Sequence, residues 1–186
     1  MKIVNCKLEI IIVLTFALLI FLLPQAANAA LIINRPMYLG LTDGLVGYWS
    51  FDGPDMQGTS ARDRSGNGNS GILTNGPLRV AGKIGQALSL DGSNDYVTTP
   101  SISGASLTAL TYSFWIKTSA TTGMPLDWNA TRFCRIGGVT ANKLNCAVDG
   151  GSSGSATTVS NINNNTWHHI AITSTSNSQI IYFDSI

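Results

Sequence analysis

The chain has 186 residues, of which 11% are charged, and its formal net charge at neutral pH is +1. This balance offers no basic surplus to neutralise phosphate groups, so we expect neither nucleic acid nor an anionic membrane as a partner. The length is enough for one domain with a substantial hydrophobic core.

The first 29 residues have the layout of a secretory signal peptide. Lys2 and Lys7 form a positive start, an apolar run covers residues 10–23, and small residues at Ala27 and Ala29 predict cleavage after Ala29. The run is shorter than the roughly 20 residues of a membrane-spanning helix, although an uncleaved anchor is the alternative. The sequence thus predicts a secreted or cell-surface protein, with no membrane partner once the signal is removed.

The composition after the signal favours an all-β fold. Glu9 is the only glutamate of the chain, and Gly, Ser, Thr and Asn fill the spaces between short apolar runs. Such a chain has few strong helix formers and many turn signals. No stretch after residue 30 has a helical period.

Residues 30–43 form a lead-in of undefined structure, and a series of strands separated by turns follows. The stretch 82–100 predicts a strand on each side of a turn at residues 91–94. Two late strands are joined by the polar segment 174–178. The expected strands lie within residues 44–53, 71–77, 82–100, 106–119, 165–176 and 178–186.

The stretch 106–119 carries the clearest strand pattern. Tyr112, Phe114 and Ile116 share one face, and Trp115 lies on the other. Large side chains on both faces predict an inner strand of a two-sheet sandwich.

Cys134 and Cys146 flank a turn centred on Thr140. If they pair, Ile136 lies opposite Leu144, and the apolar residues of the hairpin fall on one face. Directly opposed residues are within disulfide reach, and an exported protein favours oxidation. Two buried free thiols are the alternative.

Six segments then follow one another in a familiar order: GLVGYWSFDG, DRSGNGNSGIL, GKIGQALSLDGSNDYV, LTYSFWIK, NTWHHIAIT and IIYFD. From residue 44 to the end the chain resembles bacterial laminin G-like domains, which are jelly-roll modules of the concanavalin A-like lectin/glucanase type. The resemblance implies a two-sheet antiparallel jelly-roll sandwich, usually a non-catalytic extracellular module for adhesion or glycan recognition. Because such domains continue for several further strands, it also implies that C-terminal strands are missing after Ile186.

Catalysis is the less favoured function. Glycosidases of this fold need two carboxylates across the scissile bond, and the Glu-x-Asp-x-x-Glu pattern of the glucanase relatives requires glutamates that residues 30–186 lack. His168 and His169 are the only histidines, and neighbours on a strand point to opposite faces, so they cannot share a metal. We expect one to pack beside Trp167 and the other to face solvent, in structural roles.

The segment 61–71 contains Asp63, Ser65, Asn67 and Gly68, which match the first half of an EF-hand calcium loop. The twelfth position, where a bidentate glutamate belongs, is Thr74, so the loop is not an EF-hand. One interpretation is a turn in which Asp63 binds backbone amides and the glycines adopt positive φ.

The resemblance to laminin G-like domains also implies a possible calcium ion, Ca²⁺, at a loop rim, and the turn interpretation does not exclude it. The candidate calcium ligands are either Asp52, Asp63 and Asn67, or Asp91 and Asp95 of the DGSND turn.

Glycan recognition needs an exposed aromatic ring beside polar groups. Trp128, between Asp127 and Asn129, is the candidate, and its alternative role is to cap one end of the sandwich. The sequence as a whole predicts a non-catalytic extracellular binding or adhesion module for a glycan or a surface protein. The alternatives are a carbohydrate-active enzyme and a structural spacer of a longer surface protein.

Overall fold

The structure of the chain is a computed structural model, and it describes residues 43–100, 109–129, 132–148, 155–175 and 178–184. The predicted signal peptide and nearly all of the lead-in lie outside the described residues. Every described sheet is antiparallel, and within these ranges the one helical element is a three-residue 3₁₀ turn. The all-β prediction is therefore confirmed.

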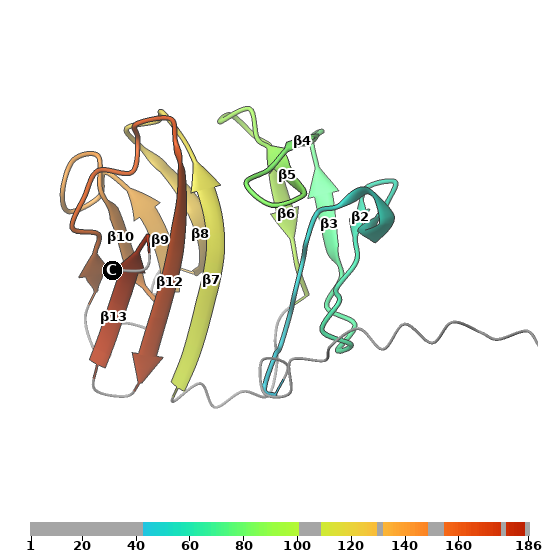
Figure 1. The fold of residues 1–186 in the computed structure, drawn as a ribbon, viewed down its shortest axis with the longest axis horizontal. Coiled ribbons are helices and arrows are strands. Elements are labelled where there is room, and N and C mark those ends of the chain that lie inside the picture. The colour runs from blue at the N-terminus through green and yellow to red at the C-terminus, as the bar shows by residue number, and fades with distance from the viewer. Residues whose placement is uncertain (1–42, 101–108, 130–131, 149–154, 176–177, 185–186) are drawn as a thin grey trace, which may run out of the picture. The chain divides into compact units, whose positions relative to one another are not determined.

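Residues 43–100 form two small sheets (Figure 1). One has the strand order β1-β2-β3-β6, and the other is the hairpin β4-β5. The sequence predicts the strands on both sides of the turn at residues 91–94 but misses β4. The elements are η1 (Gly53–Asp55), β1 (Met56–Gln57), β2 (Ser60–Ala61), β3 (Gly71–Thr74), β4 (Leu78–Ala81), β5 (Gln86–Ser89) and β6 (Tyr96–Thr98).

The strand expected within residues 44–53 does not form. Residues 45–52 have no regular secondary structure, because their backbone groups bond to a loop instead of a neighbouring strand. The Tyr48 carbonyl accepts a hydrogen bond from the Arg64 amide at 2.8 Å, and the Val46 carbonyl accepts one from the Asn69 side chain at 2.9 Å. The prediction of a strand here was wrong.

Residues 109–184 form two sheets that share one core (Figure 1). Their strand orders are β13-β12-β7 and β11-β10-β9-β8. Buried side chains of both sheets, such as Leu144 and Ile170, belong to one cluster, as in a sandwich. The strands are β7 (Ala109–Lys117), β8 (Gly123–Asn129), β9 (Arg132–Ile136), β10 (Leu144–Ala147), β11 (Ala156–Thr157), β12 (Trp167–Thr175) and β13 (Ser178–Phe183).

Strand β7 alternates as its sequence predicts, with Tyr112, Phe114 and Ile116 packed against the core. The expectation that both faces are covered is not met, because Trp115 on the outer face is 39% exposed. In the part of the chain that the structure describes, β12 and not β7 is the central strand of this sheet. The two-residue alternation identified the inward face correctly, but it cannot distinguish a central strand from an edge strand.

The β9–β10 hairpin has the register that the cysteines predict. Cys134 lies opposite Cys146 and Ile136 opposite Leu144, and the two cysteines form a disulfide with a Cα–Cα distance of 4.1 Å. The hairpin residues Cys134, Ile136, Leu144, Cys146 and Val148 are all buried in the core. Both the predicted disulfide and the predicted apolar face are confirmed.

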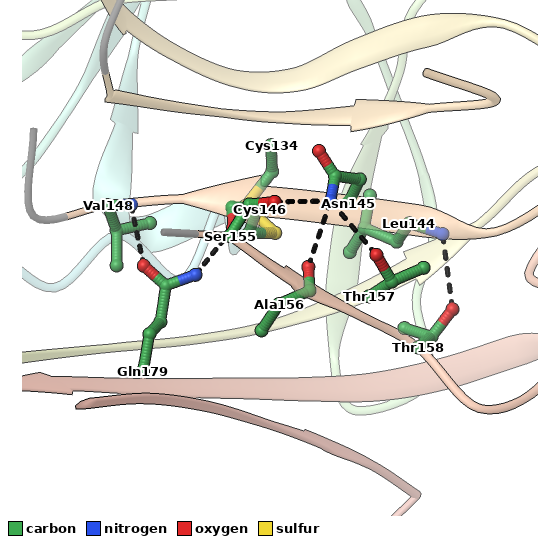
Figure 2. The surroundings of a disulfide bond; sticks show 10 residues. All are labelled: Cys134, Leu144, Asn145, Cys146, Val148, Ser155, Ala156, Thr157, Thr158 and Gln179. Carbon is green, nitrogen blue, oxygen red and sulfur yellow. Dashed lines mark hydrogen bonds between the residues drawn. A yellow bond between two sulfur atoms is a disulfide. The ribbon is translucent and has the colours of Figure 1, made fainter. Parts of the chain in front are cut away.

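Strand β13 is tied to this hairpin by one side chain (Figure 2). Gln179 accepts a hydrogen bond from the Val148 amide at 3.0 Å, and its own amide donates to the carbonyl oxygen of Cys146. At the start of β10, the Thr158 amide donates to the Leu144 carbonyl, and the Thr158 hydroxyl accepts a hydrogen bond from the Leu144 amide. The backbone groups at both margins of β10 therefore find partners.

Candidate functional site

The loop around Asp63 is organised by one buried carboxylate. Oδ1 of Asp63 accepts the backbone amides of Tyr48 and Ser65 at 2.9 and 2.8 Å. Oδ2 accepts the Ser65 hydroxyl at 2.7 Å and the Asn69 amide at 2.9 Å. Burial alone would raise the pKa of this carboxyl, but the hydrogen bonds from Tyr48, Ser65 and Asn69 outweigh it and hold the pKa below its usual value.

These four hydrogen bonds fill the four acceptor positions of a carboxylate. Gly66 and Gly68 have φ of +92° and +77°, as the turn interpretation expects. Asn67 donates its side-chain amide to the carbonyl oxygen of Leu45 at 2.7 Å. The loop therefore acts as a polar clamp on the irregular segment 45–48.

The other calcium candidates lie in two separate places. Asp52 accepts the backbone amide of Gln86 at 2.7 Å. Asp91 accepts the amides of Ser93, Asn94 and Asp95 at 2.8 to 3.3 Å. The hydrogen bonds from Ser93 and Asn94, the largest contributions, lower the pKa of Asp91.

Asp95 in turn accepts the amide of Asp91 at 3.1 Å, so the two acids belong to one turn. No group of three or more His, Cys, Asp or Glu side chains comes close enough within the described residues to hold a metal. A cation here would need backbone carbonyl or water oxygens as further ligands.

A polar groove lies beside the clamp. Asp55, a residue that the sequence reasoning missed, is buried and forms an ion pair with Arg64 at 3.3 Å. Hollows of about 350 and 280 Å³ share Asp55 and Arg62 in their walls. Ser60, Ser70 and Gln57 also line the first hollow. The sequence offered no signal for this groove, because it depends on how η1, β1 and β2 fold together.

Two of the three candidate glycan residues, Trp128 and Asp127, lie on different faces of β8, and the side chain of the third, Asn129, lies outside the described part of the chain. Trp128 is half-buried, packs against the core, and lies with its ring centroid 4.3 Å from that of Tyr112. Asp127, opposite Phe133, is exposed. A register shift between Asp127 and Asn129 accompanies the inward position of Trp128. The structure therefore does not bring the ring of Trp128 and the carboxylate of Asp127 together, because the Trp128 ring packs against the core.

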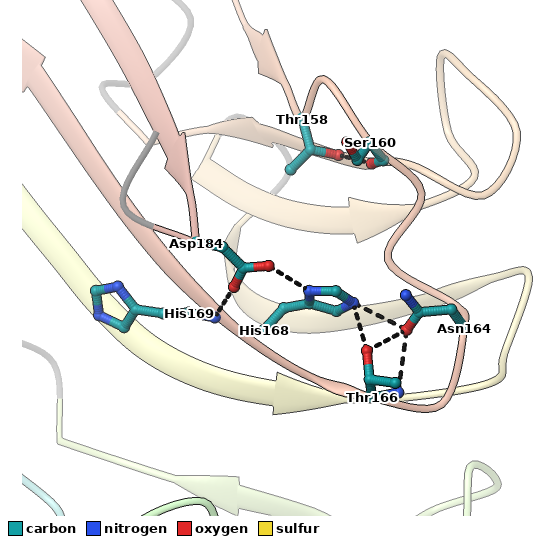
Figure 3. A network of polar contacts seen from close by, with 7 residues as sticks. All are labelled: Thr158, Ser160, Asn164, Thr166, His168, His169 and Asp184. Atoms are coloured by element: carbon teal, nitrogen blue, oxygen red, sulfur yellow. Dashed lines mark hydrogen bonds and ion pairs between the residues drawn. The ribbon is translucent and has the colours of Figure 1, made fainter.

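A second polar network lies at the end of β12 (Figure 3). His168 is buried and contacts the carboxylate of Asp184 through Nδ1 at 2.8 Å. Its Nε2 lies 3.1 Å from the Thr166 hydroxyl and 2.9 Å from Oδ1 of Asn164. The hydrogen bond from His168, the largest contribution, lowers the pKa of Asp184.

This order of acid, imidazole and hydroxyl resembles a nucleophilic triad, but the surroundings do not suit that role. The imidazole points into the core against Phe183, with ring centroids 4.6 Å apart, and Asn164 competes with Thr166 for Nε2. His169 lies on the outer face, with its ring 5.1 Å from that of Trp115. The histidines therefore point to opposite faces, as predicted, and the buried one packs on Phe183.

The family comparison bears on the C-terminal half. The family model described as the concanavalin A-like lectin/glucanases superfamily, of laminin G type, matches residues 91–186, which is more than half of the chain. The chain belongs to this superfamily. Comparisons with curated proteins and with solved structures give no match.

Membership in the laminin G-like group supports a carbohydrate- or protein-binding module in general terms. Laminin G-like domains are typically extracellular and generally non-catalytic. Among the described residues, no helix is long and apolar enough to cross a membrane.

Proposed function

We propose that the protein is an exported, non-catalytic module that binds a glycan or a surface protein. Laminin G-like membership is the observation that carries this proposal. The hydrogen bonds of the carboxylates support a non-catalytic role. Asp63, Asp91 and Asp184 each accept backbone amides in a structural hydrogen-bond network. A glycosidase would instead need two carboxyl groups facing each other across a cleft.

The groove beside Asp55 and Arg62 is the first candidate for the binding surface. Arg62 has an exposed side chain at the wall of both hollows, and hydroxyl and amide groups of Ser60, Ser70 and Gln57 lie around it. A lining rich in donors and acceptors suits the hydroxyl groups of a sugar or the polar groups of a peptide. The exposed Asp127, near the end of β8, marks the second candidate surface.

Calcium dependence is part of the proposal, and the turn of Asp91 and Asp95 is its preferred location. The exposed Asp91 and the half-buried Asp95 each use one carboxylate oxygen for backbone amides. The second oxygen of each accepts no hydrogen bond from the described residues. Asp63 is less suited, since a cation there would displace hydrogen bonds that already fill the carboxylate.

Binding of the full chain to a panel of neutral and acidic oligosaccharides tests the proposal. We expect Arg62→Ala to weaken saccharide binding about tenfold or more, whereas Lys117→Ala, an exposed change on β7, leaves binding unchanged. If Asp127→Ala loses saccharide binding and Arg62→Ala does not, the binding site lies on β8 and not in the groove. Saccharide hydrolysis would favour the enzyme alternative. Binding to neither saccharides nor surface proteins would favour the spacer.

A further inference from the structure

His168 joins three separate parts of the C-terminal sandwich. It lies on the inward face of β12, opposite Ile116 of β7. Its ring packs on Phe183 of β13, and its two nitrogens contact Asp184 and the loop that precedes β12. Figure 3 shows the imidazole between these two polar partners. Both nitrogens therefore have defined neighbours, and the nature of those neighbours determines where the ring carries protons.

The partner of Nδ1 is a hydrogen-bond acceptor. The Asp184 carboxylate also accepts the His169 amide through Oδ1 at 2.9 Å, and its lowered pKa keeps it ionised near neutral pH. An ionised carboxylate can only accept. Nδ1, at 2.8 Å from Oδ2 of Asp184, therefore carries a proton.

The partner of Nε2 is also an acceptor. Oδ1 of Asn164 receives the backbone amide of Thr166 at 3.0 Å and the Thr166 hydroxyl at 2.7 Å. Because a backbone amide can only donate, the Asn164 atom that faces it must be the oxygen and not the nitrogen. The same oxygen lies 2.9 Å from Nε2 of His168. Nε2 thus also needs a proton to make this contact favourable.

We propose that protonated His168 is a pH-sensitive clasp that holds the loop of residues 158–166 against the end of β13. The doubly protonated ring satisfies Asp184 and Asn164 at once. When the ring loses one proton and keeps Nδ1–H for Asp184, the lone pair of Nε2 faces that of the Asn164 oxygen. The Thr166 hydroxyl can then turn to Nε2, but only by giving up its hydrogen bond to Asn164.

The loop that the clasp holds reaches both sheets. The Asn165 amide donates to the Thr118 carbonyl at the end of β7, at 2.9 Å. The Ile162 amide donates to the Asn142 carbonyl in the turn between β9 and β10, also at 2.9 Å, and the Asn163 side chain binds that of Asn142 at 3.0 Å. Release of the clasp therefore loosens the connection between the two sheets at this end.

The charged surroundings of His168 determine the direction of the effect. Asp184, which directly follows β13, is the charged group in direct contact with the ring among the described residues. From β7 the apolar Ile116 faces it, and His169 points to the opposite face of β12. The clasp is therefore closed while His168 is protonated and Asp184 ionised, and it opens as rising pH removes the proton from the ring.

Two measurements on the full chain test the clasp. Nitrogen-15 NMR of the imidazole, from pH 5 to 9, should show both nitrogens of His168 protonated in the closed state. Over the same range, hydrogen exchange corrected for the intrinsic rate should show protection of residues 158–166 falling about 10- to 100-fold as the ring is deprotonated, the range typical of a charge-assisted hydrogen bond. A ring that is singly protonated at pH 5, or protection that does not follow its titration, would overturn the proposal.

Two variants distinguish a pH-sensitive role of His168 from a purely structural one. Asn164→Asp places a second carboxylate near Nε2 and should move the loss of loop protection up by about one pH unit, a tenfold change. His169→Gln, on the outer face, should leave the midpoint in place. If Asn164→Asp does not move the midpoint, or if His169→Gln abolishes the pH dependence, the clasp is not at His168.

Discussion

Gln179 accepts a hydrogen bond from the buried amide of Val148 at 3.0 Å, across the boundary between the two sheets of the sandwich. The same side chain donates to the carbonyl oxygen of Cys146. One glutamine therefore satisfies a backbone donor and a backbone acceptor at the C-terminal end of β10, where Val148 lies just beyond the paired residues. Polar groups of this kind are costly to bury without a partner.

Replacement of Gln179 by Met keeps its length but removes both hydrogen bonds. We expect Gln179→Met to lower the free energy of unfolding by about 1–3 kcal/mol, because the Val148 amide stays buried without a partner. Urea denaturation of the full chain measures the effect. The neighbouring exposed change Ser178→Ala should stay within about 0.5 kcal/mol of the wild type, and equal stabilities of the two variants would contradict the assigned role of Gln179.

Reduction of the Cys134–Cys146 disulfide should lower the free energy of unfolding by about 3 kcal/mol, because a short closed loop no longer restricts the unfolded chain. The measurement compares urea midpoints with and without a thiol reductant. The Cys134→Ser, Cys146→Ser double variant should match the reduced protein and be insensitive to reductant. A reductant effect that persists in the double variant would have to come from elsewhere in the chain.

Asp63→Asn should destabilise the fold by about 1–3 kcal/mol at neutral pH, since an amide cannot accept hydrogen bonds at all four positions of the carboxylate. The lowered pKa of Asp63 means that its contribution is present above the pKa of the unfolded chain and is lost as pH falls through the lower, folded value. Urea denaturation between pH 2.5 and 7 should therefore show that the free energy of unfolding falls less steeply with decreasing pH in the variant than in the wild type. Asp43→Asn, at an exposed position, is the matched control and should leave both stability and pH profile unchanged.

A thermal melt in about 10 mM calcium and again in chelator tests the metal proposal. A site with a dissociation constant of about 0.1 mM adds roughly 2.7 kcal/mol, which raises Tm by about 5–10 °C for a chain of this size. The Asp91→Asn, Asp95→Asn double variant should lose this shift, whereas Asp127→Asn should keep it. Identical melts of the wild type in the two buffers would limit the DGSND segment to its role as a turn.

The β9–β10 hairpin shows what the sequence could predict. Two cysteines fix a register, and the alternation of apolar residues then assigns every side chain of the hairpin to a face. The inward residues of β7 follow from the same two-residue period. Local pattern was sufficient in both cases because the interacting residues belong to one strand or to neighbouring strands.

The sites depend on contacts that no local pattern contains. His168 and Asp184 lie 16 positions apart and meet only because β12 pairs with β13. Asp55 meets Arg64 through the folding of β1 and β2. Trp128 turns inward beside a register shift, and strict alternation gives no sign of such a shift. The sequence shows which residue types are present at these sites, but it does not show which residues they contact in the folded chain.

The disulfide also determines how the domain would respond to mechanical tension. It joins Cα atoms 4.1 Å apart that are separated by 12 positions in the chain. When the oxidised domain is pulled apart, that segment cannot extend, so the released contour length is shorter by about 35–40 Å than in the reduced domain, at roughly 3.4 Å per residue. If the protein is the adhesion module proposed above, it would therefore lengthen less in each unfolding event on a surface under shear, and the residues between the two cysteines would stay a closed loop after the surrounding sheets had separated.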